Sequence, residues 1–362
     1  MTSSRDAAQE RLPSGAADKP SELRQLSRRS WRYLLGRSTR EFLRNECPDL
    51  AAGLTYYAVL AVLPGLIALV SLLGLLGQGP SSLAAMLEVA RQLVPPAGLA
   101  VIEPVLTGLS ASSAPTWGLV LGLGGALYFV SRYVGAFSRA MNRVYDVREG
   151  RPLWKIEPLL LGITAVIGLL SVAALLLLVI SGPLAEALGE VLGLTREVLL
   201  VWRLAKWPLL VVIVVVVVAL LYSVTPNVRQ PRFRWLSPGA VLAILVWIAA
   251  SALFGLYVTN VAVYGATYGS LGGVIVFLVW LWLTNVALLL GAVLDGEVER
   301  ARELQAGMPT ERDIQLPARD ERASAKAAEG EARDRARGRD LGHGEADDSA
   351  AAPSPDRGAE GA

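Results

Sequence analysis

Arginine side chains recur at helical intervals in one stretch of the sequence. Arg132, Arg139 and Arg143 follow one another at spacings of seven and four residues, which place them near one face of a helix. A guanidinium group pairs with phosphate or carboxylate through parallel hydrogen bonds, so this row has the chemistry to hold an anionic headgroup. Arg132 follows Trp117 by 15 residues, about 22 Å along a helix, which predicts a position inside the inner leaflet of a hydrocarbon core of roughly 30 Å. We therefore take Arg132 and Arg139 as candidate substrate-binding residues.

A second interpretation of these arginines stays open. Arg132 can extend its side chain to the membrane interface, and Arg139 and Arg143 can simply mark the cytoplasmic side of a span. Asp49 and Asp295 stand at the ends of the first and last apolar segments, and we expect them to serve as structural ion-pair partners.

Three polar residues within apolar segments are further candidates. Tyr56 and Tyr57 can line the same cavity as the arginines or belong to an interfacial aromatic belt. Asn285 lies in the middle of the last apolar segment, where its amide needs a partner. A hydrogen bond between helices is the first interpretation of Asn285, and contact with a substrate is the second.

Proline and small residues indicate how the helices pack. Pro64 is predicted to kink the first span. Glycines at intervals of four let helices approach closely and predict packing seams, and a homodimer seam has the same pattern. The glycines at this spacing are Gly118 and Gly122, and Gly265, Gly269 and Gly273.

Signatures of an enzyme are absent from the sequence. His343 is the only histidine and Cys47 the only cysteine, and no cluster has metal-ligand spacing. There is no phosphate-binding loop of the G-x-x-x-x-G-K-[ST] form. We therefore expect no catalytic residue, no metal and no cofactor, and no binding of nucleic acid.

The elements that must position these residues are apolar segments long enough to cross a bilayer, which takes about 20 residues. Hydrophobic residues make up 53% of the chain. The predicted fold is an all-α, polytopic membrane helix bundle of about six transmembrane helices, with interfacial amphipathic helices at about 30–46 and within 83–109. The six predicted spans are 50–77, 117–137, 158–181, 199–224, 236–258 and 271–294.

Basic residues alternate between the loops. The first 48 residues hold ten Lys and Arg and the 139–157 stretch holds five, whereas 78–116 holds only Arg91. This pattern predicts a multi-pass protein of the inner, or plasma, membrane with both termini in the cytoplasm. The predicted domains are a disordered tail over 1–29, a six-span membrane domain over 30–299, and a second disordered tail over 300–362.

Three stretches together resemble the YihY/BrkB family of bacterial inner-membrane proteins. They are DLAAGLTYYAVLAVLP at 49–64, AMNRVYDVREGRPLW at 140–154 and YGATYGSLGGVIV at 264–276. The resemblance covers about residues 30–300. The resemblance implies a six-helix membrane fold. Members of this family were once labelled as ribonucleases, and a role in moving or sensing envelope lipids has been suggested for relatives. Because the sequence lacks nuclease groups, we do not expect a ribonuclease.

These observations lead to one expected function and one alternative. We expect a transporter or lipid translocator, with a cytoplasm-facing basic cavity that contacts membrane lipids, anionic ones in particular. The alternative is a non-catalytic membrane scaffold that binds other envelope proteins. A homo-oligomer is compatible with both.

Overall fold

The computed structural model describes residues 28–75, 115–179, 195–229, 237–260, 271–308 and 316–351. Within these ranges every secondary-structure element is a helix, and one isolated β-bridge joins Val228 to Ala318. The helices are α2 (Arg28–Arg44), α3 (Cys47–Leu75), α6 (Pro115–Val144), α7 (Leu153–Val179), α9 (Arg196–Val224), α10 (Pro238–Asn260), α12 (Leu271–Gln305) and α13 (Arg322–Ala351). The predicted all-α class is confirmed.

Among the described residues, six helices are long and apolar enough to cross a membrane, which confirms the predicted number of spans. Their apolar segments are Cys47–Ala68, Trp117–Val144, Leu153–Ala174, Glu197–Val224, Pro238–Val258 and Gly272–Gln305. α12 has 35 residues and is therefore about 52 Å long, more than the roughly 30 Å of hydrocarbon it must cross. Its last turns consequently project beyond the bilayer.

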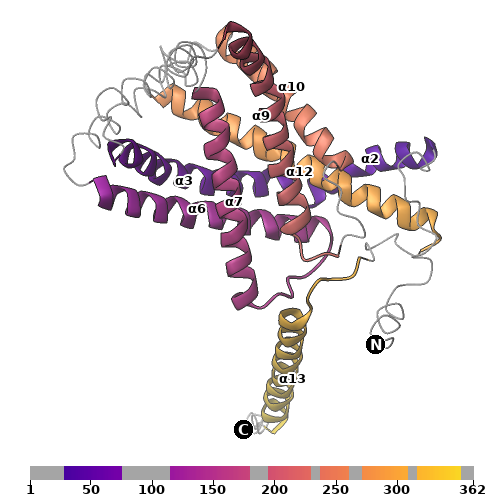
Figure 1. Ribbon diagram of the computed structural model, residues 1–362. Helices are drawn as coiled ribbons and strands as arrows, with labels where there is room; N and C mark the ends of the chain where they lie inside the picture. The colour runs from indigo at the N-terminus through magenta and orange to yellow at the C-terminus, as the bar shows by residue number, and fades with distance from the viewer. Residues whose placement is uncertain are drawn as a thin grey trace, which may run out of the picture.

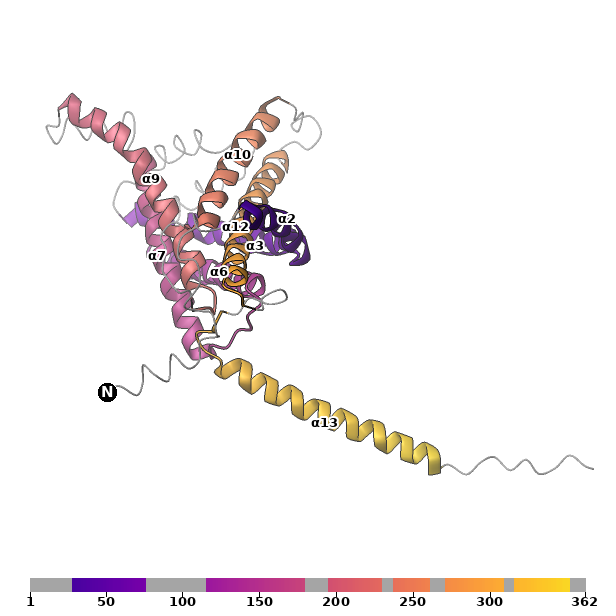
Figure 2. The ribbon, with the colours of Figure 1, turned by 90° about the vertical axis from the view of Figure 1, so that its right-hand side faces the viewer.

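The spans gather at one end, which we call the polar end. It is built by described residues at 44–50, 142–153, 224–229, 294–308 and 316–321. Contacts between these segments hold it together: Arg143 donates to Glu46 at 2.9 Å, and the Asn227 amide N–H donates to the Asn142 side chain at 2.7 Å. α3 and α6 lie side by side in Figure 1, whereas α9 and α10 diverge away from the polar end in Figure 2.

Two seams of small residues bring helix backbones together. A Cβ at Gly122 would lie 2.5 Å from the backbone nitrogen of Ala68, and one at Gly118 would lie 2.5 Å from the Ser71 hydroxyl, so both glycines lie in the α3–α6 contact. Pro64 packs against Gly125 in the same seam, and α3 continues through it as one helix. Gly239 and Gly291 form the matching seam between α10 and α12.

The other three glycines of the predicted pattern are Gly265, Gly269 and Gly273. Gly273 is buried near the start of α12. Gly265 and Gly269 lie outside the described residues, as do the interfacial helices expected within 83–109.

Asn285 joins three spans through its side-chain amide. The Tyr133 hydroxyl of α6 donates to Asn285 Oδ1 at 2.8 Å, and Asn285 Nδ2 donates to Thr55 Oγ1 of α3 at 3.1 Å. Nδ2 also donates to the carbonyl of Leu281 at 3.1 Å. Because no water is available in hydrocarbon, this network satisfies the amide within the protein.

The chain on both sides of the spans is more ordered than the sequence predicted. Leu34 of α2 is buried against Leu294 and Val298, so α2 packs on α12 in addition to presenting Leu35 and Leu43 outward. Arg300 and Glu303 are buried, residues 316–321 pack on the rest of the polar end, and most side chains of α13 are exposed over 322–339. A disordered tail was predicted over 300–362 because few apolar residues lie there, whereas the structure has helix up to Gln305 and over Arg322–Ala351.

Replacing Gly122 by alanine is expected to destabilise the protein, because the new methyl group would meet the α3 backbone at 2.5 Å. Overpacking of this kind costs about 1–3 kcal/mol. Thermal unfolding in detergent measures the effect. The matched control is Gly124→Ala on the same helix, where a Cβ meets nothing within 4 Å, and an equal loss of stability in both variants would contradict the close approach.

Replacing Asn285 by leucine is expected to lower the stability of the protein, because the Tyr133 hydroxyl loses its hydrogen-bond acceptor. A double-mutant cycle of Asn285→Leu with Tyr133→Phe should give a coupling of about 0.6 kcal/mol, the average for hydrogen bonds between membrane helices, and at most about 1.7 kcal/mol. Ser171→Ala is the control, because the Ser171 hydroxyl donates within its own helix to the carbonyl of Ile167. Additive effects of the two substitutions would show that the hydrogen bond contributes nothing.

Candidate functional site

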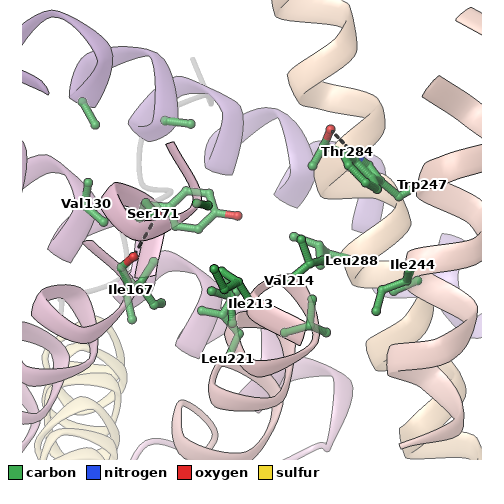
Figure 3. A pocket seen from close by; sticks show the side chains of 18 residues that line it. Val130, Ile167, Ser171, Ile213, Val214, Leu221, Ile244, Trp247, Thr284 and Leu288 are labelled. Atoms are coloured by element: carbon green, nitrogen blue, oxygen red, sulfur yellow. Dashed lines mark hydrogen bonds between the residues drawn. The ribbon is translucent and has the colours of Figure 1, made fainter. Parts of the chain in front are cut away.

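A cavity of about 460 Å³ lies between the spans, within the size range of small-molecule sites. Six helices line it with apolar side chains, and none of the lining residues is charged. In Figure 3, Ile244, Trp247 and Leu288 lie on one side, and Val130, Ile167 and Ser171 lie on the other. The lining residues are Ala58, Ala61, Val130, Tyr133, Val134, Ile167, Ser171, Ala174, Ile213, Val214, Val217, Val218, Leu221, Ala243, Ile244, Trp247, Thr284 and Leu288.

The few polar groups in the cavity wall already have partners inside the protein. The Tyr133 hydroxyl donates to Asn285, and the Thr284 hydroxyl donates to the carbonyl of Trp280 at 2.9 Å. The indole N–H of Trp247 donates to Thr284 at 3.1 Å. The wall therefore suits a hydrocarbon chain better than a polar solute, because a polar solute would lose its hydration without gaining hydrogen bonds.

The predicted basic residues do not line this cavity. At 3.6 residues per turn, the cavity-facing residues Val130, Tyr133 and Val134 occupy one face of α6, and Arg132 and Arg139 fall on the opposite face. Arg139 is exposed. The arginine row is thus present on α6, but it points away from the apolar cavity.

Arg132 is paired with a carboxylate that the sequence analysis did not single out. Its Nη2 lies 2.8 Å from Glu157 Oε2 of α7, with the two side chains 38% and 40% exposed. The guanidinium also lies over the Tyr128 ring at 5.3 Å from the centroid. Glu157 is only four residues after the start of α7, so the pair lies about one turn from the end of that span. Arg132 is therefore nearer the membrane boundary than its distance from Trp117 indicated.

The other candidates lie apart from one another. Tyr56 is 61% exposed on the outside of α3, with its ring 5.5 Å from that of Tyr57, and neither residue lines the cavity. Asp49 is exposed at the start of α3. Asp295 Oδ1 accepts a hydrogen bond of 2.7 Å from the Gly239 amide N–H, which fixes the start of α10 on α12. The structure brings only Asn285 close to the cavity, through Tyr133.

Sequence reasoning missed a buried group at the polar end. Arg151 is 7% exposed, and its guanidinium donates to Glu149, to Ser138 and to the carbonyl of Thr225. Burial opposes ionisation of Glu149, but hydrogen bonds from Arg151 and Asn142 outweigh it and lower its pKa. The carboxylate is thus charged at neutral pH. The Arg-Glu-Gly-Arg-Pro stretch at 148–152 could have indicated this buried group, but its arginines were counted only to assign the orientation of the spans.

A second charged network joins α2 to α12. Arg37 lies 3.2 Å from Glu297, and Arg300 contacts both Glu297 at 3.2 Å and Asp146 at 3.5 Å. Burial opposes the charge of Arg37, but Glu297, Tyr33 and Glu41 outweigh it and raise its pKa. The network fixes α2 and the α6–α7 loop on the projecting part of α12.

Among the described residues, no group of three or more His, Cys, Asp or Glu side chains could hold a metal ion. Cys47 is buried. His343 lies in α13, but its side chain is outside the described part of the structure. The absence of an enzymatic function stays a prediction.

Known proteins resemble this chain over its membrane part. The chain is 30% identical over 260 residues to the putative ribonuclease-like protein YfkH of Bacillus subtilis. This alignment covers 72% of this chain and 93% of that protein. It is 31% identical over 262 residues to a UPF0761 membrane protein of Alkalilimnicola ehrlichii, and 30% identical over 279 residues to one of Pseudomonas aeruginosa. The aligned parts cover 69% and 72% of this chain, and 55% and 61% of the two relatives. No solved structure matches the chain.

The match to a family is as broad as the match to these relatives. Residues 38–314, which contain all six spans, match the family described as virulence factor BrkB. This confirms the resemblance noted in the three sequence stretches. The chain belongs to the BrkB family and is an integral membrane protein.

Proposed function

We propose that the protein is a lipid translocator that accepts one acyl chain at a time in its apolar cavity. The cavity of about 460 Å³ carries the proposal, because its wall offers hydrocarbon contacts and no charged group. An apolar cavity stays dry, and walls without a filling lose dispersion contacts. A flexible acyl chain from the surrounding bilayer restores these contacts without any loss of hydrogen bonds.

The basic residues act at the headgroup rather than at the chain in this proposal. Arg132 and Arg139 lie on the outer face of α6, and Arg132 is partly exposed about one turn from the end of the neighbouring span. Guanidinium groups at that level can pair with phosphate of an anionic lipid while the chain enters between helices. The predicted basic cavity is thereby replaced by an apolar cavity with a basic outer edge.

The proposed orientation places the polar end in the cytoplasm of a plasma-membrane protein. The described loop between α6 and α7, with the adjoining helix ends at 139–157, carries five Lys and Arg. Such an excess near short loops favours the cytoplasmic side, and both termini follow from an even number of spans.

A scaffold remains the second candidate function, and one observation favours it. α13 projects away from the spans in Figures 1 and 2, and most of its side chains over 322–339 are exposed, so it can present a surface to another protein. We propose no nuclease activity, although the name of the Bacillus subtilis relative refers to ribonucleases.

Filling the cavity is expected to slow lipid movement. Purified protein would be reconstituted into vesicles with fluorescent phosphatidylglycerol or phosphatidylcholine, and crossing would be followed by quenching from outside. Ala61→Phe and Ala174→Phe place a ring in the cavity and should reduce the rate about tenfold, which corresponds to roughly 1.4 kcal/mol of added barrier.

The matched control is Ala165→Phe, which adds the same ring to an exposed position of α7. Its rate should equal that of the parent protein. Arg132→Ala should slow phosphatidylglycerol more than phosphatidylcholine. Correctly folded protein that accelerates neither lipid would contradict the translocator and favour the scaffold.

A further inference from the structure

Residues 316–321, which we call the strap, pair with the chain that follows α9. Ala318 forms an antiparallel bridge with Val228. The Arg229 amide N–H donates to the carbonyl of Pro317 at 2.9 Å, and the Arg319 amide N–H donates to the carbonyl of Asn227 at 3.1 Å. The strap is thus held by backbone hydrogen bonds and not only by surface charge.

Arg319 fixes the strap to the carboxyl end of α9. Its guanidinium donates to the carbonyls of Val228 at 2.8 Å and Val224 at 3.4 Å, and also to that of Ser223. The last carbonyls of a helix lack partners in their own helix and carry partial negative charge, so a cation there is stabilising. The Arg319 side chain therefore acts as a cap for α9.

Asp320 fixes the strap to the start of α7. Its carboxylate lies 2.8 Å from Lys155 Nζ, and the hydrogen bond from Lys155 lowers the pKa of Asp320, so the group is charged at neutral pH. The Ala323 amide N–H donates to the carbonyl of Gly150 at 2.8 Å. The fit is close, because a Cβ at Gly150 would lie 1.9 Å from the carbonyl oxygen of Asp320.

The strap also connects to α12 through the α6–α7 loop. The carbonyl of Gly150 in this loop accepts a hydrogen bond from the Ala323 amide N–H, just after the strap, and Asp146 in the same loop lies 3.5 Å from Arg300 of α12. Contacts around the strap therefore connect α7 and α9 to the projecting part of α12. α7 and α9 supply one part of the cavity wall, and α10 and α12 supply another. α9 and α10 diverge from this end in Figure 2.

We propose that the strap is a latch that sets the separation between the α7–α9 and α10–α12 parts of the cavity wall. While the strap is bound, the polar ends of α7, α9 and α12 are held together and the cavity keeps one width. When the strap is released, α9 moves relative to α10 and the cavity changes width. The consequence for lipid movement rests on the proposed function, whereas the movement of the helices does not.

The latch is tested by measuring the distance between α9 and α10 in the full-length protein. Cys47 would be replaced by alanine, and nitroxide labels would be attached at Val212→Cys and Leu245→Cys, both exposed positions. Pulsed electron resonance should give one narrow distance distribution in this parent. Arg319→Ala/Asp320→Ala should shift or broaden it.

A second variant releases the strap without altering its residues, which guards against a folding defect. Gly150→Ala places a methyl group against Asp320 and should change the distribution in the same way. The matched control is Arg333→Ala/Asp334→Ala, which removes the same pair of residue types from exposed positions of α13 and should leave the distribution unchanged.

Hydrogen exchange at the Arg229 and Arg319 amides reports whether the strap has left. Faster exchange in both strap variants with an altered distance distribution supports the latch. Faster exchange with an unchanged distribution overturns it, and so does unchanged exchange, because the contacts described would then not hold the strap. Failure of lipid movement in the parent would affect the proposed function alone, since the distance measurement needs no transport.

Discussion

The constraint on which the whole structure depends is that hydrocarbon offers no hydrogen bonds. Every backbone group inside the bilayer must be satisfied within the protein, which makes each span a helix. Polar side chains follow the same constraint: the Asn285 amide is satisfied by Tyr133, Thr55 and the carbonyl of Leu281, all within the protein. Without a hydrophobic force between helices in lipid, close packing at Gly122 and Gly291 supplies contact instead.

Polar and apolar functions are consequently separated along the bundle. Charged groups gather at the polar end, where Arg151, Arg300 and Arg319 are held by carboxylates or helix carbonyls and order the loops. The cavity further along the spans has only hydrocarbon and internally satisfied hydroxyl groups in its wall. Both proposals rest on this separation: the apolar cavity would accept a lipid chain, and the polar end would set how the helices around it are spaced.

The spans could be predicted from the sequence, but the apolar cavity could not. Length and hydropathy are properties of single segments, so six spans could be predicted from them. The cavity depends on how helices diverge, which no local pattern encodes. Arg132 looked deeply placed because depth was counted along α6 alone, whereas the register of α7 brings Glu157 to it. The order of the chain after residue 300 was missed because α12 continues as a charged helix whose partners, such as Asp146, are remote in sequence.

The most direct measurement uses a phospholipid with a photoreactive group at the end of one acyl chain. The protein would be irradiated in bilayers containing this lipid, and the labelled peptides would be identified by mass spectrometry. An acyl chain in the cavity should label the lining residues Ile167, Ile213 and Val217, and Ala174→Phe should remove this labelling. Labels confined to outward positions such as Leu169 and Val212, unchanged by the substitution, would contradict an acyl-chain site.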